Sequence, residues 1–333
     1  MDDKFFMQLA LDEAWKYQLL TYPNPAVGAV VVRDGAVLCV AAHRQAGTSH
    51  AEVLALLGAY ESMTHKSLEF DRFDAKLAHE FLLSLEEGFF AGCEIYVTLE
   101  PCSHVGKTPS CASLLQSLRL ARVVVGQLDP IKSHSGGVGM LESISEIRVG
   151  VLQEECQRLL EPFLIWQKRA FVVFKIAQSI NGRIGGGYLS SQASLTHTHK
   201  LRSVCTKMLI GGNTVRVDRP RLDCRFVDKK APDIYIYSKD GKFDRDIGLF
   251  GVANRSVEIG SDLSFLQTPS LVLIEGGDGM INVMQKYIDW FIFYTTPKLS
   301  CNNLTYNTKI DLDFLHFERL DVDILIWSKK RGH

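Results

Sequence analysis

Short apolar segments, separated by segments with helical periodicity, constrain the fold of this chain most. In the first half, strands are expected at residues 26–32, 36–42, 94–99 and 121–127, and helices at 4–18, from about His50 onward, and at 111–119. In the second half, strands are expected at 171–177, 207–212, 233–237, 270–277, 289–296 and 323–328, and helices at 193–204 and 279–287. Strands that alternate with helices favour a mostly parallel sheet covered on both faces, so the sequence predicts an α/β fold.

Two domains are expected, because 333 residues are too many for one small core. We place a first domain at 1–150, a linker helix rich in Glu, Gln and Leu at 151–169, and a second domain at 170–333. Residues 60–92 interrupt the first domain with helical periodicity and mixed charge. This segment is interpreted as a helical insertion.

Composition excludes several classes of partner. The formal net charge is −1, so the chain offers no broad basic field for a nucleic-acid backbone. No apolar run approaches the ~18 residues of a membrane helix. The start, MDDKFFMQLA, lacks the basic region of a signal peptide, and eight scattered cysteines favour reduced thiols. We therefore expect a cytoplasmic protein whose partner is a small molecule.

Two short stretches predict a metal site. SHAEVLAL (49–56) places His50 two positions before Glu52, and TLEPCSHVGKTPSC (98–111) contains Cys102 and Cys111. A catalytic zinc takes three protein ligands and keeps one position open. Zinc deaminases use a His/Cys/Cys set with a non-ligand glutamate, in the pattern H-x-E…P-C-x-x-C. Here eight residues separate the two cysteines, where that pattern has two.

The chemistry of such a site remains feasible at this spacing. Glu52 projects about 200° around a helix axis from His50, yet in a first helical turn both can border one cavity. A glutamate there can move a proton from water to a ring nitrogen and to leaving ammonia. The alternative is a core histidine with two small buried thiols. The combination of H-A-E opening a helix and P-C following a strand favours zinc.

Longer motifs in both halves carry a family resemblance. PNPAVGAVVV (23–32), HRQAGTSHAEVLAL (43–56) and TLEPCSHVGKTPSC closely resemble the bifunctional deaminase/reductase of bacterial riboflavin biosynthesis. The long gap between the cysteines separates that family from cytidine and tRNA-adenosine deaminases. FKIAQSINGRI (174–184), GGNTVRVDRPRLDCR (211–225) and LIEGGDGMI (273–281) resemble the family's reductase motifs in the expected order.

The resemblance implies a fold, two activities and an assembly. The fold would be a cytidine-deaminase-like α/β/α domain followed by a dihydrofolate-reductase-like α/β domain. The first activity would be zinc-dependent hydrolytic deamination of 2,5-diamino-6-(5-phosphoribosylamino)pyrimidin-4(3H)-one. The second would be NADPH-dependent reduction of the ribosyl chain to ribityl. The family also implies one Zn²⁺ per chain and a homo-oligomer, either a dimer or a tetramer.

Site residues follow by position from the same resemblance. Glu52 and Lys175 would be catalytic, and His50, Cys102 and Cys111 would be the metal ligands. The substrate positions would be Asn24, His43, His104, Lys107, Asp129, Ser191, Arg202, Leu222, Arg225 and Glu275. The cofactor positions would be Gln178, Tyr188, Thr214, Asp218, Gly276, Gly277, Asp278 and Gly279. The chain departs from the family pattern at Asn181 for Asp, Tyr188 for Trp and Arg219 for Asp.

Other hypotheses stay open at this point. One is a zinc deaminase acting on nucleic acid or on a free nucleoside or nucleotide, with an unrelated or degenerate C-terminal domain. The other is a non-catalytic scaffold stabilised by zinc. A structural zinc site usually has four protein ligands, so a fourth ligand would favour the scaffold.

Overall fold

The computed structural model describes residues 2–104, 106, 108–132, 135–185 and 189–332. Lys107 and Tyr188, which the family resemblance places in the substrate and cofactor sites, lie outside these described residues. The chain forms two compact units that divide between Phe163 and Leu164. The predicted α/β architecture is confirmed in both units.

A five-stranded sheet forms the centre of the first unit. Its strands are β1 (Gly28–Arg33), β2 (Ala36–Ala42), β3 (Cys93–Leu99), β4 (Arg122–Gln127) and β5 (Glu146–Val149), in the order β2-β1-β3-β4-β5. β1 pairs antiparallel with β2 and β3, whereas β3, β4 and β5 are parallel. Asp34 and Gly35 join β1 to β2 with positive φ angles of 52° and 76°. Such a two-residue turn matches the twist of a hairpin.

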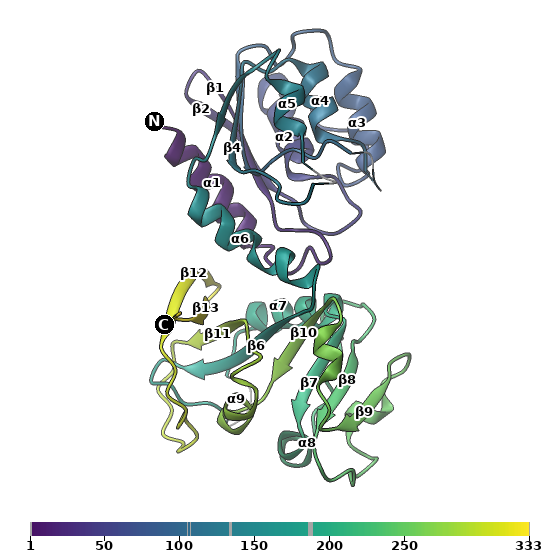
Figure 1. Ribbon diagram of the computed structural model, residues 1–333, viewed down its shortest axis with the longest axis vertical. Coiled ribbons are helices and arrows are strands. Elements are labelled where there is room, and N and C mark those ends of the chain that lie inside the picture. Colours follow the sequence, from purple (N-terminus) through teal and green to yellow (C-terminus); the bar gives the residue numbers. More distant parts are fainter. Residues whose placement is uncertain (1, 105, 107, 133–134, 186–188, 333) are drawn as a thin grey trace. The chain divides into compact units, whose positions relative to one another are not determined.

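Helices cover both faces of this sheet (Figure 1). α1 (Asp3–Trp15) and α6 (Gln153–Trp166) lie on one side, and α2 (Ala51–Thr64), α3 (Ala75–Leu83), α4 (Cys111–Leu118) and α5 (Gly137–Leu141) lie on the other. α1 approaches β1 so closely that a Cβ at Gly28 would lie 1.9 Å from the carbonyl oxygen of Ala10. A side chain at residue 28 would therefore force the helix off the sheet.

The predicted insertion at 60–92 is largely packed onto the core. Its first residues complete α2, and its own helix is the short α3. Phe90 is fully buried, and Phe70, Phe73 and Phe81 pack against the cluster formed by α2, α4 and the sheet. Burial of several aromatic rings makes this segment part of the folded unit.

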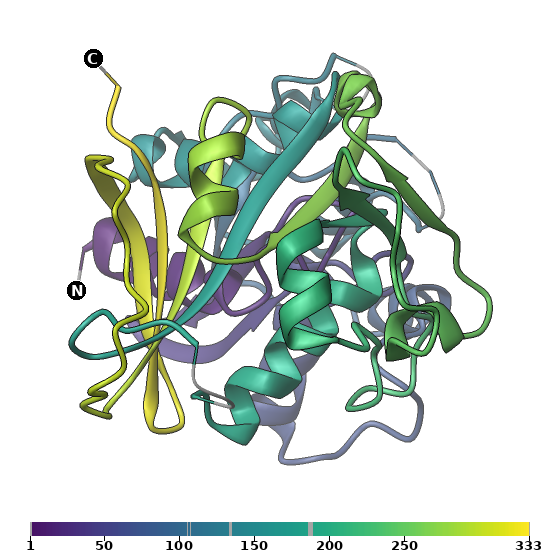
Figure 2. The ribbon, with the colours of Figure 1, turned by 90° about the horizontal axis from the view of Figure 1, so that it is seen from below.

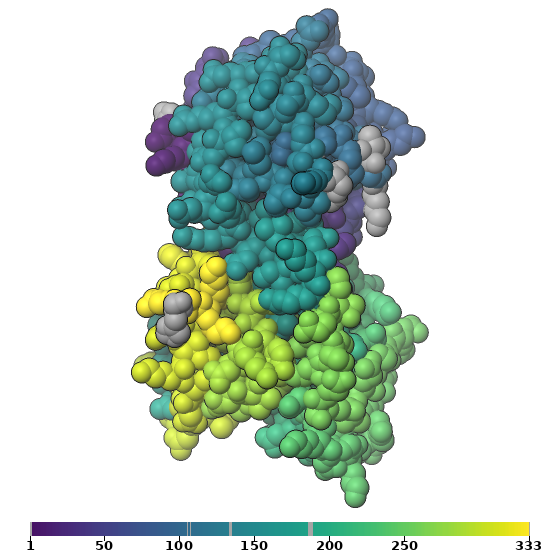
Figure 3. Space-filling model, in the orientation of Figure 1, coloured from purple at the N-terminus to yellow at the C-terminus, as the bar shows by residue number. Residues whose placement is uncertain are grey.

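An eight-stranded sheet forms the centre of the second unit, in the order β12-β13-β11-β6-β10-β7-β8-β9. The strands are β6 (Ala170–Ser179), β7 (Lys207–Gly211), β8 (Asp233–Tyr237), β9 (Val257–Gly260), β10 (Ser270–Glu275), β11 (Trp290–Thr296), β12 (Leu312–Leu320) and β13 (Asp323–Lys330). β13 pairs antiparallel with β11 and β12, and the other pairs are parallel. The edge strand β12 lies on the surface (yellow in Figure 3).

Helices and helical turns cover the second sheet on both faces (Figure 2). They are α7 (Gln192–Val204), α8 (Gly212–Asp218), α9 (Asp278–Met284) and the 3₁₀ turns η1 (Gly248–Gly251) and η2 (Ser264–Gln267). α9 buries Met280, Ile281 and Met284 in one core. α7 packs on the opposite face, where His197 contacts the rings of Tyr294 and Trp327. Across the described residues, no helix combines the length and apolar character needed to cross a membrane.

Candidate active sites

The three predicted metal ligands come together at the helix starts of α2 and α4. His50 is the N-cap residue of α2, Cys111 is the first residue of α4, and Cys102 follows β3. The His50 Nδ1 lies 3.4 Å from the Cys111 Sγ and 3.8 Å from the Cys102 Sγ. On the other side of the ring, His50 Nε2 is 3.1 Å from the Thr108 hydroxyl. Thr108 therefore orients the ring so that Nδ1 faces the thiols, as outer partners of metal ligands do.

This donor set fits a zinc ion. The ligand atoms of His50, Cys102 and Cys111 lie within 4.8 Å of one another, and no fourth His, Cys, Asp or Glu joins them among the described residues. One nitrogen and two sulfur donors suit zinc, and three protein ligands leave one position open. A structural zinc site would require one more ligand.

Ionisation of the two thiols is strongly coupled. The hydrogen bond with Cys111 is the largest cause that lowers the pKa of Cys102 to about 4, and the Cys111 backbone N–H also donates to the Cys102 sulfur at 3.4 Å. The same pairing raises the pKa of Cys111. Cys102 therefore loses its proton more readily than Cys111, and a divalent cation would favour ionisation of both thiols.

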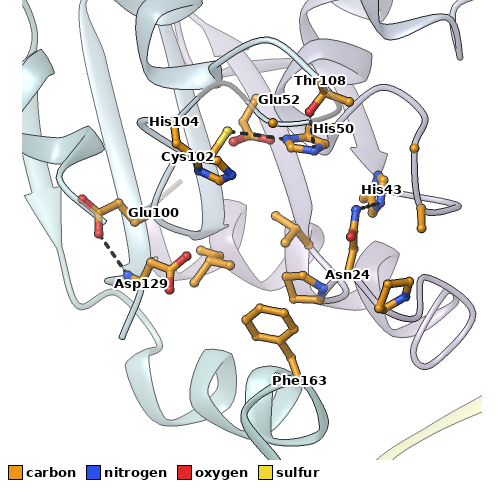
Figure 4. A pocket seen from close by; sticks show the side chains of 17 residues that line it. Asn24, His43, His50, Glu52, Glu100, Cys102, His104, Thr108, Asp129 and Phe163 are labelled. Carbon is orange, nitrogen blue, oxygen red and sulfur yellow. Dashed lines mark hydrogen bonds between the residues drawn. The ribbon is translucent and has the colours of Figure 1, made fainter. Parts of the chain in front are cut away.

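Glu52 lies beside these ligands and is 4% exposed. Burial raises the pKa of its carboxyl group, while the positive charge of His50 opposes that effect. Glu52, His50 and Cys102 face the same cavity in Figure 4. A carboxyl group with a raised pKa can accept and return a proton near neutral pH, which suits general acid–base chemistry.

The cavity has a volume of about 360 Å³ and lies within the first unit. Asn24, His43, His104 and Asp129, four of the five substrate positions that the resemblance implies in this half, line it. Further lining residues are Pro23, Pro25, Val27, Ala46, Gly47, Leu99, Glu100, Gly106, Thr108 and Phe163. The apolar walls with a few polar groups are typical of a small-molecule site.

Asn24 and His43 contact each other at one end of the cavity. The Asn24 Nδ2 is 3.1 Å from the His43 Nε2, and the His43 Nδ1 is 3.2 Å from the Ser49 carbonyl oxygen. Burial is the largest cause that lowers the pKa of His43 to about 4, so its imidazole is neutral at neutral pH. With Asn24 at Nε2 and the Ser49 carbonyl at Nδ1, both ring nitrogens of His43 have protein partners.

Glu100 is a site residue that the sequence analysis did not single out. Its carboxylate accepts hydrogen bonds from the backbone N–H groups of Asp129, Gly136 and Val138, each at 3.0 Å. It thereby holds the segment after β4 beside the segment that carries Cys102 (Figure 4). The only signal in the sequence is an acidic residue directly before Pro101 at the end of an apolar strand.

In the second unit, Lys175, Arg202 and Glu275 form a partly buried charged cluster. The register of β6 and β10 pairs Lys175 with Glu275, and the Lys175 Nζ lies 3.5 Å from the Glu275 Oε2. Arg202, from α7, donates to both Glu275 oxygens at 2.8 Å and 2.9 Å. Burial lowers the pKa of Lys175. Burial alone would raise the pKa of Glu275, but the two cations lower it to about 2.

The remaining implied substrate positions of this unit are less close together. Leu222 has a φ of 54° and its carbonyl accepts from Arg255 at 2.6 Å. Arg225 contacts Asp223, whose carbonyl accepts from Arg202 at 3.4 Å, so this loop borders the charged cluster. Ser191 instead caps the start of α7, at the opposite end of that helix from Arg202.

The implied cofactor positions come from three elements. Gly276, Gly277, Asp278 and Gly279 form the turn from β10 into α9, and Thr214 and Asp218 belong to α8. A Cβ at Gly276 would lie 3.9 Å from the Thr214 hydroxyl, so the starts of α8 and α9 adjoin. Asp278 accepts from Asn307 and Thr308, and Gln178 bonds to Thr295 and Tyr306. These two side chains thus have protein partners already.

Two departures from the family pattern have a physical basis. Asn181 accepts from the Ser300 N–H at 3.1 Å and donates to the Ser300 carbonyl at 2.9 Å. An aspartate could not make the second bond, because a carboxylate has no donor. Arg219 ends α8 in the left-handed region and pairs with Asp244 at 2.6 Å.

Family models match each unit separately. Residues 1–127 match the cytidine and deoxycytidylate deaminase zinc-binding region, and residues 170–325 match the RibD C-terminal domain. Fold and site thus define a two-domain α/β protein that joins a deaminase-type metal centre to a RibD-type C-terminal domain. The chain belongs to the RibD family of riboflavin biosynthesis proteins.

Individual relatives agree with this assignment. Riboflavin biosynthesis protein RibD of Aquifex aeolicus is 37% identical over 243 residues, which cover 70% of this chain and 61% of that protein. RibD of Synechocystis is 36% identical over 221 residues, covering 64% of this chain and 53% of that protein. The matched part thus spans less than two thirds of either relative.

Solved structures match over a greater length. A diaminohydroxyphosphoribosylaminopyrimidine deaminase/5-amino-6-(5-phosphoribosylamino)uracil reductase from Thermotoga maritima has a TM-score of 0.64 at 25% identity. RibD of Acinetobacter baumannii has the same TM-score and identity. Each match covers 99% of both chains.

Proposed function

We propose that this protein catalyses two consecutive steps of riboflavin biosynthesis. The first is hydrolytic deamination of 2,5-diamino-6-(5-phosphoribosylamino)pyrimidin-4(3H)-one, and the second is NADPH-dependent reduction of the ribosyl chain to ribityl. One observation carries the proposal: His50, Cys102 and Cys111 form a three-residue donor set beside the buried Glu52, and this site borders a cavity. Three protein ligands leave a fourth position on zinc for water. The match of residues 170–325 to the RibD C-terminal domain supports the proposed reduction.

For deamination, His50, Cys102 and Cys111 would hold the zinc, which supplies a Lewis acid that makes water a nucleophile near neutral pH. Glu52 would take one proton from the attacking water and deliver it to the ring nitrogen. It would then take the second proton from the resulting hydroxyl group and deliver it to the amino group, which leaves as ammonia. Its burial and raised pKa support that shuttle. Asn24 and Asp129, which lie on opposite sides of the cavity in Figure 4, would hold the pyrimidine between them.

For reduction, NADPH supplies the hydride. Lys175 would face the reacting carbon of the ribosyl chain and neutralise the negative charge that develops as the hydride arrives. Glu275 and Arg202 fix the position of its ammonium group, and burial lowers its pKa, which favours release of a proton. The turn at 276–279 and Thr214 would contact the cofactor, as the family position implies.

The rival hypotheses have less support. A zinc scaffold calls for a fourth ligand, and none joins the three donors within the described ranges. A nucleic-acid deaminase calls for a basic face, and the net charge of the chain is −1.

Domain limits, assembly and location complete the proposal. We place the deaminase at 1–150, a linker at 151–169 and the reductase at 170–333. The protein would work in the cytoplasm as a homo-oligomer. Eight thiols that form no disulfide suit a reducing compartment. Light scattering on the purified chain tests the oligomer.

The two activities are separable in one experiment. The zinc-loaded protein is incubated with the diaminopyrimidinone substrate, first without and then with NADPH, and the products are followed by mass. We expect ammonia and the deaminated compound without NADPH, and the ribityl compound only after NADPH is added. Absence of ammonia release from zinc-loaded protein would refute the proposal.

A further inference from the structure

The contacts around Asn24 define which atom of its amide the cavity presents. Ser49 turns its carbonyl oxygen toward the His43 Nδ1 at 3.2 Å. A carbonyl oxygen only accepts, so Nδ1 carries the proton. In a neutral imidazole the other nitrogen, Nε2, then has only a lone pair. At 3.1 Å from Nε2, Asn24 must donate through its Nδ2.

The remaining atom of the amide, Oδ1, is therefore left for the cavity. In Figure 4 the amide nitrogen of Asn24 points to His43, and its oxygen lies on the other side of the group. An oxygen in this position accepts hydrogen bonds and cannot donate them. The cavity wall at Asn24 thus selects a ligand that offers N–H groups, as an aminopyrimidinone ring does.

The tautomer of His43 depends in turn on the insertion. Ser49 is fully buried, its N–H donates to the Phe73 carbonyl at 3.2 Å, and its hydroxyl donates to the Arg72 carbonyl at 2.7 Å. Arg72 is held by Glu61 of α2 at 3.0 Å, and the Arg44 guanidinium lies over the Phe73 ring. Residues 72–73 thus fix Ser49, which directly precedes the metal ligand His50.

We propose that His43 is a positioning residue that locks the Asn24 amide with Oδ1 toward the cavity, and that the insertion holds this lock through Ser49. His43 itself does not bind the substrate, although the family position alone implies that it does. The inference rests on the proposed deaminase function for its substrate, but the hydrogen-bond chain from Phe73 to Asn24 stands independently of it.

A double-mutant cycle distinguishes positioning from direct contact. His43→Ala and Asn24→Ala are each expected to raise the KM for ammonia release roughly 3- to 10-fold, with a smaller change in kcat, because one hydrogen bond is lost. If His43 acts through Asn24, the double variant is no worse than Asn24→Ala alone. Effects that multiply in the double variant would overturn the proposal.

Three controls accompany the cycle. Zinc content must stay at the wild-type level in all variants, and Ser62→Ala, exposed on α2, should leave KM unchanged. His43→Gln can donate to Ser49 and accept from Asn24, so it should recover part of the lost affinity. If His43→Ala does not fold, the KM of His43→Gln is compared with that of Asn24→Ala instead, and this comparison decides between positioning and direct contact.

A second readout needs no activity. With ¹⁵N-labelled histidine, two-bond ¹H–¹⁵N spectra of the zinc-loaded protein report the tautomer of His43, assigned by the signal missing in His43→Gln. We expect the tautomer protonated at Nδ1, and the Nε2-protonated tautomer would overturn the proposal. A wild-type protein with the expected tautomer but no ammonia release would support the lock and refute the proposed substrate.

Discussion

Lys175 and Glu275 lie side by side on the parallel strands β6 and β10, with 3.5 Å between the Lys175 Nζ and the Glu275 Oε2. Arg202 holds the same carboxylate through two hydrogen bonds. Glu275 therefore has more cationic charge around it than it can neutralise. The excess positive charge is available to a substrate that gains negative charge in the reaction.

Lys175→Met should lower the rate of reduction far more than it lowers NADPH affinity. A cation that faces the reacting group stabilises charge that develops only in the transition state. Steady-state kinetics with the deaminated intermediate and a fluorescence titration with NADPH check the two quantities. Lys207→Met is a matched control, since Lys207 lies on β7 and pairs with Glu258 at 2.9 Å. Unchanged turnover in Lys175→Met would remove Lys175 from the mechanism.

Glu100→Gln should destabilise the first unit and weaken substrate binding while zinc stays bound. Both carboxylate oxygens of Glu100 accept hydrogen bonds from backbone N–H groups. Glutamine has only one acceptor oxygen, so its NH₂ group would face at least one of these N–H donors and leave it unsatisfied. An unsatisfied buried donor costs about 1–3 kcal/mol. Denaturant unfolding, zinc content and KM measure the effect. If Glu100 acts through Asp129, adding Asp129→Asn to Glu100→Gln should raise KM little further.

The sequence predicted the grouping of His50, Cys102 and Cys111 but not the role of Glu100, for a physical reason. Zinc chemistry restricts His50, Cys102 and Cys111 to few residue types at recognisable spacings. Glu100 binds backbone N–H groups, which every residue except proline offers, so its partners cannot be identified from the sequence. The tautomer of His43 could not be predicted from the sequence either, because it depends on a contact with the backbone carbonyl of Ser49.

Most strands were predicted because their apolar runs are buried on both faces. β12 was missed, since its apolar side chains Phe314 and Phe317 are each 70% exposed and a bulge interrupts its alternation. The edge strands β5 and β9 have four residues each and few apolar ones. α8 was missed because it has seven residues and begins with Gly212. Such elements form because neighbouring structure stabilises them, and their own sequence is a weak signal.

His197 should make the second unit less stable as the pH falls. Burial lowers the pKa of His197 to about 4, and its Nδ1 lies 2.6 Å from the Tyr294 hydroxyl. In the unfolded chain a histidine takes up its proton near pH 6.5. Between those values the unfolded state binds more protons, so stability present above pH 6.5 is lost as the pH falls toward 4.

His197→Asn isolates this contribution, because its Oδ1 can accept from Tyr294 but does not titrate. We expect the variant to be less stable than the wild type at pH 7. That difference should shrink by up to about 2 kcal/mol at pH 5, since one proton contributes about 1.4 kcal/mol per pH unit. Denaturant unfolding at both pH values provides the comparison. An equal pH dependence in both proteins would show that the pKa of His197 is the same in the native and unfolded states, and would contradict the lowered pKa.

The most direct test of the account concerns Glu52, whose carboxyl group lies buried beside His50 and Cys102, two of the three proposed metal ligands. Glu52→Gln keeps the shape of the side chain but cannot move a proton, and Glu69→Gln, on an exposed residue, serves as the control. Zinc content and ammonia release from the diaminopyrimidinone substrate are measured on the same samples. We predict full zinc occupancy with ammonia release reduced ~100-fold or more, the usual contribution of general acid–base catalysis. Ammonia release within ~10-fold of the wild-type rate, at full zinc occupancy, would contradict the assignment of Glu52 and the deamination mechanism built on it.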